Sequence, residues 1–222
     1  MKLSDTTLSL FKNFSTINQS ILIKKGNQIR TISVMKNILA EATISEDFPK
    51  DFGIYDLNQF LNVMSSLHQN PDLDFSRDDR LVIHEGDMDQ EIFLASPDVI
   101  VSPPETSIKL PSEDVTFELN TQQLTNVLKA SSIYQVPDLS VVGANGVVTL
   151  VVRDKKNSTS QKCRIVVGET EENFTLNFKV ENFKILPGSY TVSISEKLLS
   201  RFESKNLDLT YYIALEPDST FG

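Results

Sequence analysis

The chain has 222 residues and a formal net charge of −9, from 30 acidic and 21 basic side chains. No apolar run approaches the roughly 18 residues of a membrane-spanning helix, and the first residues do not resemble a signal peptide. The single cysteine, Cys163, excludes an intrachain disulfide and suits a reducing cytoplasm. Because so acidic an average surface repels nucleic acid, any contact with DNA requires a local face of different character.

A proline-rich stretch separates two halves of similar length. Residues 96–111 contain four of the nine prolines, among serines, threonine and acidic residues. Proline cannot donate to a sheet ladder, so this stretch is expected to be an extended linker or a sheet edge. We therefore predict a first domain over 1–108, including the linker from about residue 96, and a second over 109–222.

In the first half, apolar residues at helical spacing predict helices over residues 6–18 and 57–69. Strands are expected between and after them, and the turn Lys25-Gly26-Asn27 is expected to form a hairpin. The predicted strands cover residues 21–24, 28–35, 39–44, 73–75, 81–84 and 92–95.

The second half repeats the order. A strand over 115–119 precedes a helix over 121–134, and Asn145-Gly146 predicts a hairpin turn. A short helix is expected over 180–186, ended by Pro187 and Gly188. Cys163 is interpreted as a buried thiol in a strand. The remaining predicted strands cover residues 139–142, 147–152, 163–167, 174–178, 190–194 and 207–215.

A helix followed by about three short strands thus occurs four times along the chain. Helix-and-strand units in this order, with antiparallel hairpins, favour an α+β fold in which helices cover one face of the sheets. We predict two similar domains, each with two such units.

The three longest predicted helices contain no Asp or Glu in 40 residues, although composition alone would place about five there. Their polar faces carry Lys12 and Lys129; the short fourth helix carries Lys184 and is immediately preceded by Lys179. Sparse lysines without arginine or aromatic residues suit sequence-independent contacts with phosphates. Two interpretations remain open: ordinary solvated faces, or faces turned toward a polyanion. The second helix offers neutral hydrogen-bonding groups, namely Asn58, Gln59, Asn62 and Ser66.

Sites for enzymatic chemistry are not indicated. The eight glycines form no phosphate-binding loop, and His68 and His84 are isolated from other potential metal ligands. The aspartates near residue 75 lack the spacing of a calcium loop, so they are interpreted as solubilising turns. The sequence predicts no enzyme, no cofactor and no metal site.

Several segments, in order and at matching spacing, make the chain resemble the trimeric sliding clamps of T-even-type phages, which are polymerase processivity factors. The N-terminal segments are MKLS (1–4), LFKNF (10–14) and TIN (16–18), followed by IYDLNQFL at 54–61. The C-terminal segments are NFK at 182–184, PGSY at 187–190 and ALEPDST at 214–220. Residues 70–110 match poorly.

The resemblance implies a homotrimeric ring of clamp-fold subunits, with helices lining the hole and sheets forming the outer wall. It implies that the ring encircles duplex DNA in the cytoplasm of an infected bacterium and holds the replicative polymerase there. It also implies loading by an ATP-driven clamp loader and a role in late transcription with late-transcription factors. No membrane partner is expected.

Basic residues are expected to face DNA without reading its sequence. Asp5 stands where the family would place a further lysine, and capping of the first helix is its alternative role. Partners are expected to insert short apolar peptides into a surface pocket, and ordinary linker packing is the alternative use of the same apolar residues. The predicted DNA-lining residues are Lys2, Lys12, Lys24, Lys129, Lys179 and Lys184, and the predicted pocket residues are Val99, Ile100, Val101 and Leu215.

Two other classes of protein remain as alternatives. An antiparallel-sheet viral structural or tail protein would show no dependence on DNA circularity. An open single-strand binder with stacking aromatic residues would bind short oligonucleotides tightly. These alternatives differ from a ring in measurable ways.

Overall fold

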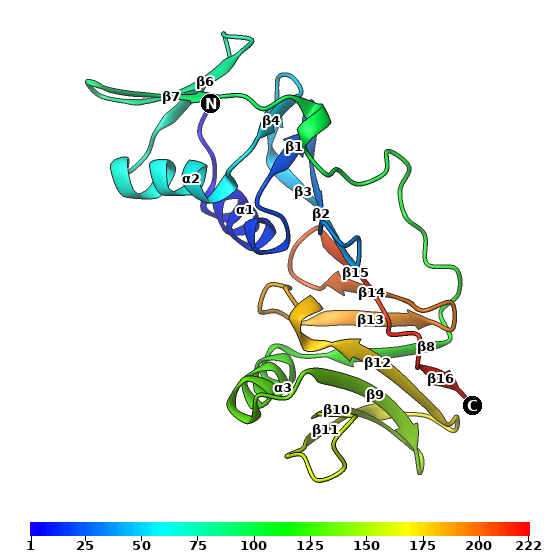
Figure 1. The fold of residues 1–222 in the computed structure, drawn as a ribbon. Coiled ribbons are helices and arrows are strands. Elements are labelled where there is room, and N and C mark those ends of the chain that lie inside the picture. The colour runs from blue at the N-terminus through cyan, green and yellow to red at the C-terminus, as the bar shows by residue number, and fades with distance from the viewer. The chain divides into compact units, whose positions relative to one another are not determined.

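The computed structural model describes all 222 residues (Figure 1). It divides into two compact units, Met1–Thr106 and Ser107–Gly222, and the sequence prediction placed the boundary after residue 108. None of its helices is long and apolar enough to cross a membrane.

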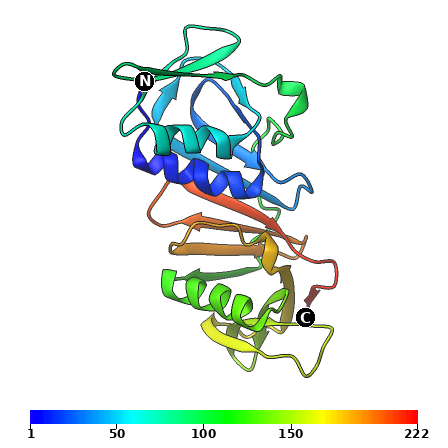
Figure 2. The same cartoon turned by 60° about the vertical axis from the view of Figure 1, so that its left-hand side comes forward.

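Unit 1 carries two helices side by side on one face of short antiparallel strands (Figures 1 and 2). Helix α1 (Asp5–Ile17) is regular, whereas α2 (Leu57–Asn62) continues into a π-helical turn, η1 (Val63–Leu67). Strand β1 pairs with β4, β2 pairs with β3, and β6 lies between β5 and β7. The bounds are β1 (Ile21–Ile23), β2 (Gly26–Ile32), β3 (Ile38–Phe48), β4 (Phe52–Ile54), β5 (Asp72–Asp74), β6 (Arg80–Glu85), β7 (Met88–Phe93) and the 3-10 turn η2 (Pro97–Val99).

Aromatic rings join the two helices of unit 1 to the strands beneath them. Phe11 of α1 is 1% exposed, and its ring centroid lies 6.2 Å from that of Phe60 in α2 and 6.4 Å from that of Phe48 in β3. Leu10 and Phe14 are buried on the same side of α1. The apolar spacing that predicts α1 therefore also determines which face of the helix packs inward.

Unit 2 has one α-helix, α3 (Thr121–Tyr134), which packs over β10 and β11. Its strands pair in two series, β11–β10–β9–β12–β16 and β8–β13–β14–β15, with antiparallel neighbours throughout. The bounds are β8 (Val115–Leu119), β9 (Asp138–Ala144), β10 (Val147–Arg153), β11 (Cys163–Glu169), β12 (Phe174–Lys179), β13 (Tyr190–Ser195), β14 (Leu199–Ser204), β15 (Leu209–Ala214), β16 (Thr220–Phe221) and the 3-10 turn η3 (Val180–Asn182).

The predicted helix over residues 180–186 is wrong, because only the three residues of η3 are helical. Beyond it, two buried tyrosines hold the backbone in a non-helical path. The Tyr190 hydroxyl donates to the Leu186 carbonyl at 2.6 Å, and the Leu186 N–H donates to the Tyr211 hydroxyl at 3.1 Å. Phe183 is buried against Phe178, with ring centroids 5.3 Å apart. Tertiary contacts thus replace the fourth helix.

The helix predicted over 57–69 is only partly correct, because α2 gives way to η1 and the helical region ends at Leu67. The strand predicted over 28–35 ends at Ile32, where the Ser33 hydroxyl accepts from the N–H groups of Asn37 and Ile38 and closes a turn. The Lys25-Gly26-Asn27 hairpin is also wrong, since β1 pairs with β4 and β2 with β3.

Three strands were not predicted, namely β4, β14 and β16. Two of them have only two or three residues, and β14, with the sequence LSRFES, has no β-branched residue and lacks the alternation of polar and apolar side chains that indicates a strand. Cys163 is half-buried rather than buried, because β11 is an edge strand with a single neighbour.

Candidate nucleic-acid interface

Side-chain caps fix the start of each helix. The Ser4 hydroxyl accepts from the Thr7 N–H at 3.2 Å, and Asp56 accepts from the Gln59 N–H at 2.9 Å. At α3, Asn120 and Gln123 form a reciprocal capping box. Each cap satisfies N–H groups that a helix start leaves unpaired, so the position at which each exposed helix face begins is set by local sequence.

The exposed faces of these helices are nearly free of charge. Helix α1 begins one residue earlier than predicted, so Asp5 lies in its first turn and is the one acidic residue in α1, α2, η1 and α3. Lys12 and Lys129 are exposed and form no ion pair. Neutral amides and hydroxyls occupy most of the remaining exposed positions, in a chain whose net charge is −9.

Three of the other predicted lysines are engaged by carboxylates. The ammonium of Lys2 lies 3.9 Å from Asp72, and that of Lys24 lies 3.0 Å from Asp51. The Lys25 backbone N–H, which also donates to Asp51, and the Lys24 ammonium lower the pKa of Asp51. Lys24 directly follows β1 and lines a cavity with residues of β2 and the linker, so the structure does not group it with Lys12.

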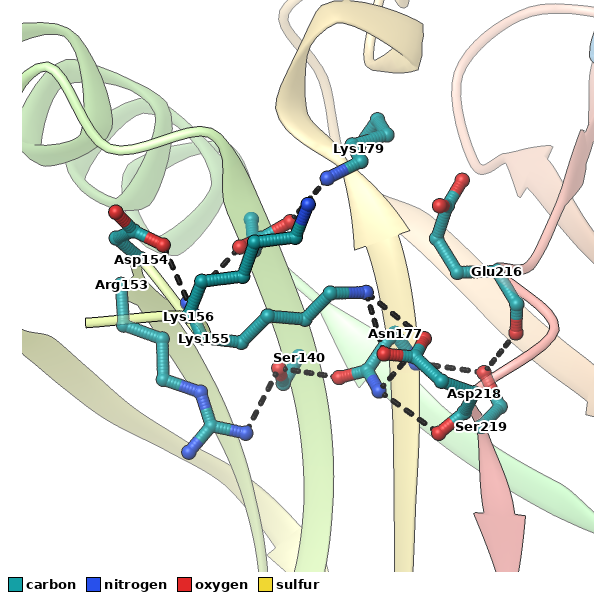
Figure 3. A network of polar contacts seen from close by, with 11 residues as sticks. Ser140, Arg153, Asp154, Lys155, Lys156, Asn177, Lys179, Glu216, Asp218 and Ser219 are labelled. Carbon is teal, nitrogen blue, oxygen red and sulfur yellow. Dashed lines mark hydrogen bonds and ion pairs between the residues drawn. The ribbon is translucent and has the colours of Figure 1, made fainter. Parts of the chain in front are cut away.

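Lys179 belongs to a polar network within unit 2 (Figure 3). Its ammonium lies 2.6 Å from the carboxylate of Asp138, which is 1% exposed, and this hydrogen bond raises the pKa of Lys179. Lys155 donates to Asp218 at 2.8 Å in the same network. Since removing either partner of a buried pair leaves an uncompensated charge, Lys179 has a clear structural task.

Lys184 is exposed and lies just beyond η3. The segment that carries it is held by the buried Phe183 on one side and by the Tyr190 and Tyr211 contacts to Leu186 on the other. Its backbone is therefore fixed although it is not helical. Lys12, Lys129 and Lys184 are the predicted lysines whose exposure best suits contact with a large anion.

The apolar residues predicted to form a partner pocket differ in exposure. Val99 is 59% exposed, whereas Ile100 is 7% exposed and its side chain lies so close to Gly53 that a Cβ there would come within 2.7 Å of it. Val101 is half-buried. Leu215 lies in unit 2, directly after β15, and is buried. Ile100 thus packs as ordinary linker, and Val99 has the largest exposed fraction.

Sequence reasoning did not identify a cavity of about 400 Å³ between the middle of the linker, residues 102–105, and strands β1 and β2. Lys25 and Arg30 line it with Lys24, and the Arg30 guanidinium donates to the Pro104 carbonyl at 2.8 Å. The sequence carries no pattern that brings these residues together, because the cavity exists only where the linker folds back on unit 1. No cluster of three or more potential metal ligands is present.

The two units match two family models. Residues 2–102 match the model described as DNA polymerase processivity factor, and residues 116–217 match that described as the C-terminal part of the gp45 sliding clamp. The chain belongs to the sliding-clamp family.

Curated relatives named sliding clamp agree over the whole chain. The one from Vibrio phage KVP40 is 33% identical, with 97% of this chain and 99% of the relative covered. The clamp of Enterobacteria phage T4 is 31% identical, with 99% of each covered. The alignment therefore includes both units and the linker of this clamp.

Solved structures confirm the predicted clamp fold. The PCNA of Entamoeba histolytica has a TM-score of 0.71 at 14% identity, with 97% of each chain covered. A structure titled as the C-terminal region of FEN-1 bound to A. fulgidus PCNA has the same TM-score at 12% identity, with 99% of this chain and 100% of that chain covered. At such identities the likeness establishes the fold of the clamp and leaves its contacts to be argued from its own residues.

Proposed function

We propose that this sliding clamp closes into a homotrimeric ring around duplex DNA and tethers the replicative polymerase for processive synthesis. The observation that carries the proposal is the contrast between helix faces with one acid, Asp5, and a chain of net charge −9. Faces of this kind repel DNA less than the rest of the surface does, so they are suited to line a hole through which DNA passes.

Retention would then come from topology, because a closed ring cannot leave circular DNA however weak its contacts are. Lys12, Lys129 and Lys184 supply three exposed cations in each subunit. Few cations mean few displaced counterions and a weak, sequence-independent attraction, which permits sliding. Lys2, Lys24 and Lys179 remain in the proposed lining with a smaller contribution, since carboxylates already engage them.

Exposed sheet edges support closure between copies. Strand β7 of unit 1 and β11 of unit 2 each have one hydrogen-bonded neighbour, which leaves a row of backbone donors and acceptors for a second chain. Residues 72–91 of unit 1 hold eight carboxylates and two arginines, whereas β11 carries Arg164 and Glu169 and follows Lys162. A strongly acidic edge on one unit and an edge with little net charge on the other favour head-to-tail contacts, which can close into a ring.

The proposed partners are the polymerase, an ATP-driven clamp loader and late-transcription factors. A solved relative is described as binding the C-terminal region of FEN-1, and another as a complex of two different PCNA chains, which supports peptide partners and assembly with other clamp chains. Val99, beside Ile100 and Val101, is the proposed start of a peptide site. The clamp would serve as a scaffold rather than an enzyme, in the cytoplasm of the infected bacterium.

The test replaces Lys12 and Lys129 together by Glu and measures loader-dependent retention on circular duplex DNA. Retention should fall to the level seen on linear DNA, because the reversed charges would keep the loader from closing the ring around the duplex, while native mass stays near three times 24.9 kDa. The control is Lys36→Glu with Lys156→Glu, which makes the same change of charge at exposed positions off the helices. Unchanged retention in the Lys12 and Lys129 variant would refute the proposed lining. Retention of the wild type that is independent of circularity would favour a viral structural protein instead.

A further inference from the structure

The cavity of about 400 Å³ between the linker and strands β1 and β2 lies wholly within unit 1. Lys24 and Lys25 line it from the residues between β1 and β2, and Arg30 lines it from β2. Ser102 and Glu105 line it from the linker. Its charged lining residues are three cations and one carboxylate, in a chain whose net charge is −9. The cavity wall therefore has the opposite balance of charge from the chain as a whole.

Two of the three cations are engaged by carboxylates that do not line the cavity. The ammonium of Lys24 pairs with Asp51 at 3.0 Å, and Nε of Arg30 lies 3.3 Å from Glu41. Lys25 is exposed, and its ammonium has no partner within the protein. Lys25 is thus the one lining cation whose charge is not already matched by a carboxylate.

Several hydrogen-bond donors of the wall lack acceptors. The Nη1 group of Arg30 donates to the Pro104 carbonyl at 2.8 Å, whereas Nε and Nη2 are buried and form no hydrogen bond. Buried polar groups are nearly always hydrogen-bonded, so unpaired ones beside a cavity indicate a missing acceptor. The amide of Gln28 is exposed and unpartnered, and the Ser102 hydroxyl donates to the Ile100 carbonyl only at 3.4 Å. The wall therefore offers donors from both β2 and the linker.

Donors on several sides suit a phosphate group better than a carboxylate or an apolar peptide. A phosphate monoester presents three acceptor oxygens, whereas a carboxylate presents two in one plane. Apolar lining comes from only Leu22 and Pro103, which is little for the side chains of an apolar peptide. The volume lies within the range of small-molecule sites, so it also accommodates an organic group beside the anion.

We propose that this cavity binds a small phosphate monoester, the chemical class that includes nucleoside monophosphates. Lys25 and Gln28 donate to the phosphate oxygens, and Arg30 supplies its unpaired N–H groups after a rotation of its side chain. The organic part of the ligand lies against Leu22 and Pro103. A bound ligand joins the linker to β2. The inference goes beyond the proposed function, because the site depends neither on ring closure nor on DNA.

Variants of the wall should change the affinity in opposite directions. Lys25→Gln removes the free cation and should weaken binding about 3- to 10-fold. Arg30→Lys keeps the charge but loses the planar fork of donors, so it should weaken binding about 10-fold. Glu105→Gln removes the one lining carboxylate and should strengthen binding about 2- to 5-fold. The matched control is Lys36→Gln, which makes the same change of charge at an exposed position of unit 1 outside the cavity and should change the affinity less than about twofold.

The experiment titrates the full-length protein by calorimetry in a phosphate-free buffer with deoxyadenosine monophosphate, inorganic phosphate or deoxyadenosine. Ligand concentrations reach about 10 mM, so that a dissociation constant near about 1 mM is detected. The two phosphate-bearing probes should bind, and the nucleoside should not. Hydrogen exchange followed by mass spectrometry should slow in residues 24–30 and 101–106 when deoxyadenosine monophosphate is bound. Lys25→Gln leaves the contacts of Arg30 intact, so it tests the site even if Arg30→Lys disturbs the linker.

Three results would overturn the inference. The first is that neither phosphate-bearing probe gives heat or protection from exchange. The second is that Lys36→Gln weakens binding as much as Lys25→Gln, since the effect would then belong to the charge of the whole surface. The third is that a short peptide of alternating glutamate and alanine binds more tightly than deoxyadenosine monophosphate and protects the same segments, which would make the cavity a peptide site. Retention on circular DNA tests the proposed function separately, so either can fail while the other stands.

Discussion

The exposed helix faces of the two units carry different kinds of side chain. Unit 1 has two helices with a groove between them, in which Asn58 and Asn62 are unpartnered. Unit 2 has one helix, where Gln122 and Asn126 bond to each other and Lys129 stands exposed. The clamp fold thus fixes where helices lie, while the side chains decide whether a face offers short-range donors or an isolated charge.

The cores beneath these faces differ as well. In unit 1, Phe11 touches rings from both α2 and β3, so that one side chain couples three elements. In unit 2, the buried tyrosines Tyr190 and Tyr211 use their hydroxyls to hold the backbone of Leu186. The stability of unit 1 thus depends on apolar packing at this point, whereas that of unit 2 also depends on buried hydrogen bonds. Variants at these positions should affect the two units separately.

Phe11→Ala should have the largest effect on stability, and it should fall on unit 1. The side chain is 1% exposed, and removing a buried ring costs about 3–5 kcal/mol through lost burial and a residual cavity. Hydrogen exchange followed by mass spectrometry should show faster exchange in both α1 and α2, with α3 unchanged. Phe183→Ala in unit 2 is the matched control and should accelerate exchange around η3. Equal acceleration in both units for either variant would contradict the independence of the two cores.

Sequence periodicity predicts the helices well where the apolar face points into a local core. Helix α3 matches its predicted bounds, and α1 is displaced by one residue. The errors fall where distant contacts override local preference. Val180, Phe183 and Leu186 have helical spacing, yet the two tyrosine hydroxyls pull the backbone at Leu186 out of a helix. Nothing in residues 180–186 alone reveals this.

In the candidate site, too, local sequence predicts some features, and others depend on contacts between distant residues. The scarcity of acid on the helices is visible in the sequence, because it depends only on which residues belong to them. Which lysines are engaged by carboxylates is not visible, since Lys179 and Asp138 lie 41 residues apart and meet through the pairing of β12 with β9. The sequence can therefore identify a lysine as a candidate for DNA contact, but only the strand register shows which carboxylate it pairs with.

Glu46→Gln should have the next largest effect, and it should fall on unit 1. Glu46 is buried and accepts from the Ser4 N–H, from the Thr7 hydroxyl at 2.6 Å and from the Ser45 hydroxyl at 3.0 Å. Burial raises its pKa, but these hydrogen bonds outweigh burial and lower the pKa below the ordinary value of 4.5. Losing hydrogen bonds to a charged acceptor should cost about 1–2 kcal/mol at neutral pH.

The sign of its pH dependence follows from linkage. A carboxyl with a lowered folded pKa stabilises above its unfolded pKa, and this contribution disappears as pH falls through the folded pKa. Urea denaturation between about pH 7 and pH 3 should thus show a shallower loss of stability for Glu46→Gln than for wild type. Glu171→Gln, at an exposed position of unit 2, is the control and should follow the wild type. A parallel curve for Glu46→Gln would show that the Glu46 contacts contribute no pH dependence.

Tyr190→Phe should have the smallest effect, at about 1 kcal/mol for the lost hydrogen bond to Leu186, and it should fall on unit 2. Burial raises the pKa of Tyr190 above its ordinary value of 10.0, so the folded state keeps the hydroxyl protonated. The unfolded chain loses this proton first as pH rises, so stability present below pH 10 is lost progressively above it. The variant should lose stability less steeply than wild type in that alkaline range, with the remaining slope owed in part to Tyr211, whose pKa burial also raises. The comparison is made by urea denaturation against pH, with the exposed Tyr134→Phe as control.

Faster hydrogen exchange at residues 183–188 in Tyr190→Phe would show that the hydroxyl also holds the segment that presents Lys184. Exchange as slow as in wild type would assign that task to Phe183 and Tyr211 alone.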